Sequence, residues 1–329
     1  MSATEPLVAV VTPVYNGAYS LGRAIESVLA QTHQNWTLIV ADNLSDDGTL
    51  DLARAYADGD PRIRVEEGDV FLSMLGNWNR ALSHVPADAP YVKQLNADEV
   101  LLPTCLAEMV SLAERHPTVA VVGAYRKEDR RIAAVDLPLE REVVPGRDLV
   151  RHALLGGLDY IGPPGSVLMR ATPAMRAGEF YDPSHWPPGN PMGFCRWSVD
   201  KEPLYDLLET GDFGFAHQLL TYSPPDPGGQ TPFIWRLRAQ QPGDLELLIT
   251  YGPRFLGRRE LRRAIGRATG AYSTLLVKQA AKLRPWRDAP FRVFHGGAAA
   301  ALAAGLRLSL IHISEPTRLE SKSRVAWCG

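Results

Sequence analysis

A short polar run, Asn-Ala-Asp-Glu at residues 96–99, lies between an apolar strand segment and the apolar residues Val100–Pro103. The residues before it, Tyr91–Leu95, have the composition of a buried strand, so the run falls at the carboxyl end of that strand. Open α/β sheets bind their ligands at this edge. Carboxylate and amide oxygens suit Mg²⁺ or Mn²⁺, and such an ion commonly bridges to a substrate diphosphate. The run therefore predicts either a metal-assisted diphosphate site centred on Asp98 or a solvated polar turn.

The segments around this run alternate between buried strands and amphipathic helices. The sequence predicts strands at Leu7–Val11, Thr37–Ala41, Arg62–Val65, Tyr91–Leu95 and Val119–Ala124. Apolar residues with helical spacing lie between them, after Ser20, after Asp47, through Met74–Leu82 and through Leu106–Glu114. Such alternation is typical of an α/β fold with a doubly wound, mostly parallel sheet and helices on both faces.

The second half of the chain has a different character. Prolines and glycines are dense between residues 138 and 232, which predicts long loops over a site rather than a second regular core. Residues 245–287 have a basic, helical pattern. This pattern fits a solvated helix face, or an interfacial helix that contacts anionic lipid headgroups.

Composition excludes several classes of protein. The chain has 329 residues, of which 45% are hydrophobic and 22% charged, as in ordinary soluble domains. Its net charge of −2 gives no overall case for binding nucleic acid. Three dispersed cysteines argue against a disulfide framework or a zinc site and fit a reducing compartment. The N-terminus is interpreted as a first strand rather than a signal peptide, and the expected location is cytoplasmic, or the inner face of the membrane.

Three motifs, in chain order, resemble those of the family-2 glycosyltransferases, which are inverting nucleotide-sugar enzymes with the GT-A fold. They are TPVYNGAYSLGRAIESVLAQT after the first strand, ADNLSDDGT after the second and LNADEVLLP after the fourth. LGNWNRAL, GPPGSVLMR and FGFAHQLLTY give a looser match. The resemblance implies sugar transfer from a nucleoside-diphosphate sugar, of the uridine type, to a hydroxyl of a glycan or lipid-linked acceptor. Bacterial polysaccharide or glycoconjugate assembly is the implied setting.

The resemblance divides the chain into three parts. Residues 1–235 form the expected glycosyltransferase domain, with a nucleotide-binding half at 1–125 and an acceptor half at 126–235. Residues 236–307 form the basic helical region. Residues 308–329 contain LSLIHISEPTR, which resembles the translated read-through of a sequencing adapter, and we interpret this tail as an artefact.

A nucleotide site is expected at the tips of the first two strands. Tyr15 can stack on a pyrimidine ring, while the carboxylate of Asp42 and the backbone near Thr12 pair with the edge of the base. Tyr15 packed under a loop and Asp42 as an ordinary residue before a helix are the alternatives. The resemblance places Asn79 near the nucleotide, and a capping or packing role in its helix is the alternative. The complete predicted set is Thr12, Pro13, Tyr15, Asn16, Asp42, Asn79 and Asn96.

The resemblance also assigns the metal and the base. Asp98 would hold the divalent cation, Mg²⁺ or Mn²⁺, and Asn96 replaces the first acid of the family's D-x-D motif. His217 would be a second ligand or a phosphate contact, or else a structural histidine. Inversion requires a general base. Asp200 occupies the corresponding place at the start of a helix, with Glu202 as the near alternative; Asp200 could equally be a helix cap.

Other functions compete with this interpretation. A nicotinamide-binding Rossmann domain requires glycines in the first βα turn, where this chain has PVYNGAYSLG, and a P-loop is absent from the sequence. A degenerate family member that binds a nucleotide sugar without turnover is the main alternative. A purely structural α/β domain would bind no nucleotide.

Overall fold

The computed structural model describes residues 5–135, 137–157, 159–183, 199–225, 240–281 and 295. The chain divides into two compact units, the first formed by residues 1–195 and 199–230 and the second by residues 196–198 and 231–329. The first unit contains every predicted site residue.

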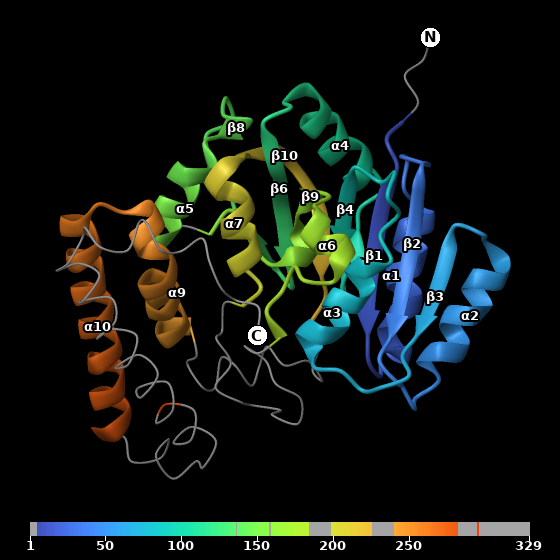
Figure 1. The fold of residues 1–329 in the computed structure, drawn as a ribbon, viewed down its shortest axis with the longest axis horizontal. Helices are drawn as coiled ribbons and strands as arrows, with labels where there is room; N and C mark the ends of the chain where they lie inside the picture. Colours follow the sequence, from blue (N-terminus) through green and yellow to red (C-terminus); the bar gives the residue numbers. More distant parts are fainter. Residues whose placement is uncertain are drawn as a thin grey trace, which may run out of the picture. The chain divides into compact units, whose positions relative to one another are not determined.

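One mixed sheet organises the first unit (Figure 1). Its order is β3-β2-β1-β4-β9-β6-β10-β5, with β7 paired to β6 and β8 paired to β10. The strands are β1 (Val8–Val14), β2 (Trp36–Asp42), β3 (Ile63–Glu67), β4 (Tyr91–Gln94), β5 (Val100–Leu101), β6 (Val119–Glu128), β7 (Arg131–Ala133), β8 (Val143–Val144), β9 (Leu168–Arg170) and β10 (Asp212–Ser223). The longest pairings, β1 with β2 and β6 with β10, are parallel. The predicted α/β class with a mostly parallel sheet is confirmed.

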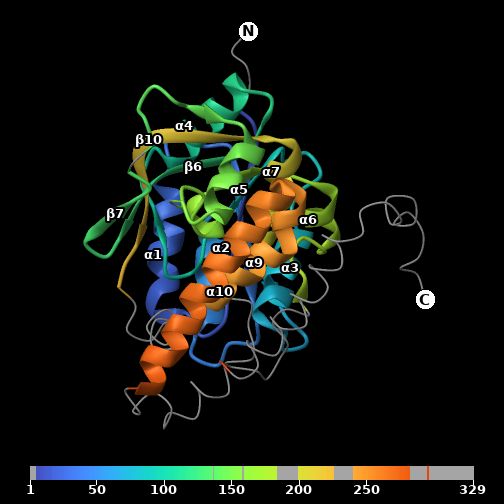
Figure 2. The ribbon, with the colours of Figure 1, turned by 90° about the vertical axis from the view of Figure 1, so that its left-hand side faces the viewer.

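Two features of the sheet differ from the predicted alternation. The short strand β9 pairs antiparallel with both β4 and β6, and so separates two strands expected to follow one another. Strand β6 extends to Glu128 rather than ending at Ala124, and it turns back into the antiparallel β7. Figure 2 shows this hairpin projecting from the sheet. Both differences come from short segments whose pairing local periodicity does not reveal.

Helices cover both faces of the sheet. They are α1 (Ala18–Leu29), α2 (Thr49–Gly59), α3 (Met74–Ser83), α4 (Cys105–Arg115), α5 (Gly146–Leu154), α6 (Pro173–Ala177) and α7 (Glu202–Thr210), with a 3₁₀ turn, η1, at Pro164–Ser166. Side chains from α1, α2 and α4 pack against the apolar strands in one core. Helices α3 and α6 lie on the opposite face, in front of the sheet in Figure 1. Strands β1 and β2 are buried along their whole length, which explains the apolar runs Val8–Val11 and Leu38–Ala41.

The second unit contains the long helices α9 (Gln240–Phe255) and α10 (Arg258–Ala281), which confirm the helical pattern predicted from residue 245 as far as residue 281. Residues 282–287 of that prediction lie outside the described residues. Leu245 and Tyr272 are at the centre of their shared apolar contact. Among the helices that the structure describes, none has the length and hydropathy needed to cross a bilayer.

Candidate nucleotide and transfer site

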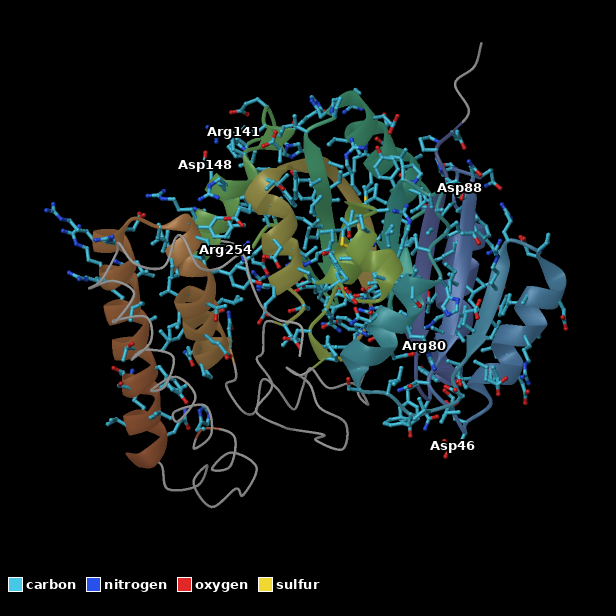
Figure 3. All side chains as sticks on the ribbon, in the orientation of Figure 1. Asp46, Arg80, Asp88, Arg141, Asp148 and Arg254 are labelled. Carbon is cyan, nitrogen blue, oxygen red and sulfur yellow. The ribbon has the colours of Figure 1, made fainter. Side chains whose placement is uncertain are left out.

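The carboxyl ends of β1 and β2 form one connected surface. In Figure 3, Asp46, which follows β2, lies below Arg80 at the lower end of the sheet, whereas Asp88, which precedes β4, lies at the upper end. The side-chain amide of Asn16 donates to Asp46 Oδ1 at 2.9 Å, and its oxygen accepts from the Asp46 backbone N–H at 3.0 Å. Asp47 Oδ2 accepts from the N–H of Ala18 at the start of α1. These bonds fix the two loops to each other, next to the exposed Tyr15.

The ring of Tyr15 is exposed to solvent and packs against one neighbouring aromatic ring, that of Phe71. It is 51% exposed and meets Phe71 edge to face, with 5.0 Å between the ring centroids. The loop that carries Phe71 is held by Asn43, whose side chain accepts from the N–H of Leu72 at 3.0 Å and donates to its carbonyl at 2.9 Å. A ring that is both exposed and held in orientation can stack on a planar ligand at a small entropic cost.

Asp42 and Thr12 each carry a buried polar atom that no other described residue pairs with. Both residues are 1% exposed. Asp42 Oδ2 accepts from the Ser45 N–H at 3.0 Å. Its other oxygen, Oδ1, and the hydroxyl of Thr12 have no hydrogen-bond partner in the described part of the chain. Because buried acceptors are nearly always paired in folded proteins, this pair marks a place where a ligand N–H group can bind.

The sequence analysis did not identify Arg80 as part of this edge. Its Nη2 donates to the Asp42 carbonyl and, at 2.6 Å, to Asn77 Oδ1. Burial lowers the pKa of the Arg80 guanidinium, against the opposing effect of Asp42, Asp69 and Glu66. The only sequence signal for this residue was its place in LGNWNRAL, on the helix that covers the ends of β1 and β2.

Asn79 lies on the same helix, but it contacts the protein's own backbone. Its side chain donates to the carbonyl of Tyr181 at 2.7 Å and accepts from the Tyr181 N–H at 2.9 Å. The Tyr181 hydroxyl donates to Gln94 at 3.0 Å, and Gln94 donates to the Asn96 side chain at 3.3 Å. Asn79 therefore fixes the segment that orients Asn96, and its direct contact with a nucleotide stays a prediction.

The polar run at the end of β4 divides into an exposed and a buried part. Asp98 is exposed, whereas Glu99 is buried and accepts from the Asn96 N–H at 3.4 Å. Burial and the nearby charge of Asp98 raise the pKa of Glu99 to about 7, although Lys93 opposes this. Asp98 is thus the carboxylate of the run that solvent and ligands can reach.

The donor set at this position suits a weakly held cation. Within the described ranges, no group of three His, Cys, Asp or Glu side chains is arranged to hold a metal ion. Mg²⁺ typically binds through one or two protein carboxylates together with substrate phosphates and water. One exposed carboxylate at a strand tip, with an amide oxygen nearby, is compatible with that mode.

Both ring nitrogens of His217 make hydrogen bonds within the protein. The residue lies on β10, with Nδ1 at 2.9 Å from the Tyr125 hydroxyl and Nε2 at 2.9 Å from the Arg141 carbonyl. A neutral imidazole has one donor and one acceptor nitrogen, and these two contacts use both. A metal role would require the bond to Tyr125 to be broken, so the geometry favours the structural alternative.

Asp200 lies two residues before α7, whose N-cap is Lys201 and whose first residue is Glu202. Burial raises the pKa of Asp200 to about 6, with Lys201 opposing and Asp159 adding to the shift. Burial and the Asp200 carboxylate raise the pKa of the Tyr181 hydroxyl. Through Tyr181, the structure brings Asp200 near the hydrogen-bonded residues that end at Asn96. A carboxylate with a pKa near neutrality can accept a proton in a reaction.

Comparison with known proteins identifies the family of this fold. The family model described as glycosyl transferase family 2 matches residues 9–171, which include β1, β2, β4 and the polar run. The chain belongs to glycosyltransferase family 2. The resemblance stated from the three motifs is thereby confirmed.

The chain spans different shares of the relatives that it matches. The chain is 28% identical over 231 residues to the putative glycosyltransferase EpsE of Bacillus subtilis, covering 66% of this chain and 78% of EpsE. It is 35% identical over 99 residues to the putative teichuronic acid biosynthesis glycosyltransferase TuaG of the same organism, covering 30% of this chain and 38% of TuaG.

Solved structures share the GT-A fold. The S. aureus TarS 1–349 complex with UDP-GlcNAc has a TM-score of 0.55 at 11% identity, covering 80% of this chain and 71% of that one. The mannosyltransferase PcManGT of Pyrobaculum calidifontis, in complex with GDP-Man and Mn²⁺, has a TM-score of 0.52 at 16% identity, covering 94% and 88%. These likenesses confirm the predicted fold.

Proposed function

We propose that this family-2 glycosyltransferase transfers a sugar from a uridine-type nucleoside-diphosphate sugar to an acceptor hydroxyl, with inversion. The observation that carries the proposal is the buried, unpartnered Oδ1 of Asp42 at the same sheet edge as the exposed ring of Tyr15, within the part of the chain that the structure describes. A uracil ring has one N–H between two carbonyl groups, so it can donate to a carboxylate oxygen while it stacks on a tyrosine.

The relatives support the choice of donor. The Escherichia coli relative WfgD is a UDP-Glc:alpha-D-GlcNAc-diphosphoundecaprenol beta-1,3-glucosyltransferase; it is 28% identical over 119 residues, covering 36% of this chain and 46% of WfgD. TarS was solved with UDP-GlcNAc, whereas PcManGT was solved with GDP-Man. The uridine preference is therefore a proposal that a donor panel must test.

Asp98 is the proposed ligand of a divalent cation, Mg²⁺ or Mn²⁺. When bound, the cation supplies Lewis-acid stabilisation of the departing diphosphate. Asn96 is proposed to hydrogen-bond the ribose, because its amide is oriented by Gln94 at 3.3 Å. The replacement of an acid by Asn96 then removes one charge without removing the hydrogen bond.

Asp200 is the proposed general base. The acceptor oxygen attacks the anomeric carbon, the bond from that carbon to the diphosphate oxygen breaks, and the hydroxyl proton passes to the Asp200 carboxylate. Glu202 is the reserve candidate on the first turn of α7. Base catalysis of this kind typically contributes ~10²–10⁴-fold to the rate.

A glycan or a lipid-linked sugar is the proposed acceptor, and contact with the membrane surface is part of the proposal. Exposed arginines in the first half of α10 support it: Arg258, Arg259, Arg262, Arg263 and Arg267. Cations at the beginning of a helix gain nothing from the helix dipole, so this placement suggests an external anionic partner. Flotation with vesicles containing anionic phospholipid should recover the protein, and neutral vesicles or a variant with these arginines changed to glutamine should not.

A panel of nucleotide sugars tests the main proposal. We expect metal-dependent release of a nucleoside diphosphate from one uridine donor, lost in Asp98→Ala. Binding of the diphosphate without release from any donor would favour the degenerate, non-catalytic family member. A protein that binds no nucleotide in calorimetry would refute both.

A further inference from the structure

An ion pair adjoins the proposed base. Lys201, the residue after Asp200, places its Nζ 2.8 Å from Asp159 Oδ2, and the two side chains are 22% and 36% exposed. Burial lowers the pKa of Lys201, but Asp159 and other acidic neighbours outweigh this and raise it above its usual value. Burial by itself would raise the pKa of Asp159. Lys201, the Gly162 N–H and Arg126 together have the larger effect, so the pKa of Asp159 lies below its usual value. Both residues are thus held in their charged forms.

The other end of the ion pair is held by a tight turn. Asp159 Oδ1 accepts from the Gly162 N–H at 3.0 Å. Gly162 has a φ of 72°, in the left-handed region that side chains disfavour. The hydroxyl of Ser166 donates to the carbonyl of Pro163 at 2.7 Å. Residues 159–166, which we term the bridging loop, therefore hold Asp159 in one position.

The bridging loop also contacts the strand that ends in the polar run. The fully buried Lys93 of β4 donates to the Gly165 carbonyl. A Cβ atom added at Gly165 would lie 1.7 Å from Glu99 Oε2, so the loop packs directly on the residue that follows Asp98. One short segment thus connects the end of β4 to the start of α7.

We propose that Asp159 and Lys201 are a positioning pair that holds the Asp200 carboxylate at a fixed place relative to Asp98 and balances its charge. This inference rests on the proposed function, because it requires Asp200 to be the base. Lys201 favours the charged form of Asp200, whereas Asp159 opposes it. Tyr181 is the third titratable group that faces Asp200.

Two single variants separate positioning from simple stabilisation. Lys201→Met removes the cation beside Asp200, which raises the pKa of that carboxyl group. The acidic limb of the pH profile of kcat should therefore move to higher pH. Asp159→Asn removes an anion and releases Lys201 toward Asp200, so the same limb should move to lower pH. In both variants kcat should fall roughly 10- to 100-fold, as expected for a displaced catalytic group, while calorimetric affinity for the nucleoside diphosphate should change little.

A matched control exists at the other end of the same helix. Arg147 Nη1 lies 3.3 Å from Glu209 Oε1 near the end of α7. Glu209→Gln breaks that ion pair, and we expect it to leave both kcat and the pH profile unchanged. Lys201→Arg keeps the charge and should restore most of the rate lost in Lys201→Met.

The outcomes distinguish this inference from the proposed function. Full transfer in Asp200→Asn would refute the base assignment, and the positioning role with it. Loss of transfer in Asp200→Asn, together with a normal kcat and pH limb in the Lys201 and Asp159 variants, would refute the positioning role alone. A shift of the limb in the same direction in both variants would also refute it, because their charges act on Asp200 with opposite sign.

Discussion

The substitution Asp42→Asn tests how the base of the donor is recognised. The change keeps the size of the side chain and one oxygen, which can still accept from the Ser45 N–H at 3.0 Å. It replaces Oδ1, which has no partner among the described residues, with an NH₂ group. An N–H of the ligand then meets a donor instead of a carboxylate oxygen.

The expected magnitude follows from the kind of bond that is lost. A hydrogen bond to a charged group contributes about 1.5–3 kcal/mol net, which corresponds to roughly a 10- to 150-fold increase in Kd. Calorimetric titration with the nucleoside diphosphate, in the presence of Mg²⁺ or Mn²⁺, measures this change. Because Asp42 is buried, little water can replace the missing bond, so the effect of Asp42→Asn should lie at the upper end of that range.

A matched variant separates the local effect from a general loss of charge. Asp60→Asn removes a carboxylate that pairs with Arg62 at 2.7 Å, before β3 and therefore at the opposite edge of the sheet. We expect Asp60→Asn to bind the nucleoside diphosphate with the same Kd as the unmodified protein. Equal affinity in Asp42→Asn and in the unmodified protein, with both folded by thermal melting, would refute the assignment of Asp42 to the nucleotide.

Four further outcomes are expected. Tyr15→Ala should weaken nucleotide binding by about 1–3 kcal/mol, the usual contribution of a base stacked on an aromatic ring; unchanged calorimetric affinity would contradict stacking. Asp98→Ala should abolish metal-dependent turnover, whereas Asn96→Asp should keep or raise it, and a large loss in the latter would show that the motif register is wrong. Because Asp200 acts as a base and its pKa is raised to about 6, kcat should fall about tenfold per pH unit below pH 6 and level off above it, and Asp200→Asn should remove this limb. Deleting residues 308–329 should leave melting temperature and nucleotide binding unchanged, and a truncated chain that fails to fold would show that the tail is genuine.

The sequence alone determined the elements that local pattern controls. The apolar runs Val8–Val11 in β1 and Leu38–Ala41 in β2 predicted buried parallel strands, because a strand covered on both faces carries apolar residues on both. The polar residues after them, Tyr15 and Asp42, followed from strand direction, since parallel strands end at one edge. The family followed from the motifs at these same positions.

Only the tertiary structure decided which side chains meet across long sequence separations. Asn79 reads as a residue of the nucleotide site, yet it binds the backbone of Tyr181, which is 102 residues away. His217 reads as a ligand candidate, yet its two nitrogens face Tyr125 and Arg141. No local pattern records such contacts, because the hydrogen-bonding capacity of a side chain is the same whichever partner the fold supplies.

The ion pair of Asp159 with Lys201 illustrates the same limit. In the sequence, Lys201 is one charge beside the predicted base, and Asp159 lies in a loop that carries no charged motif of its own. The folded chain brings the two within 2.8 Å, because the bridging loop is fixed by Lys93 beneath it. Apolar periodicity is a property of residues that are close in the sequence, whereas the position of a catalytic carboxylate depends on contacts that exist only after the sheet has formed.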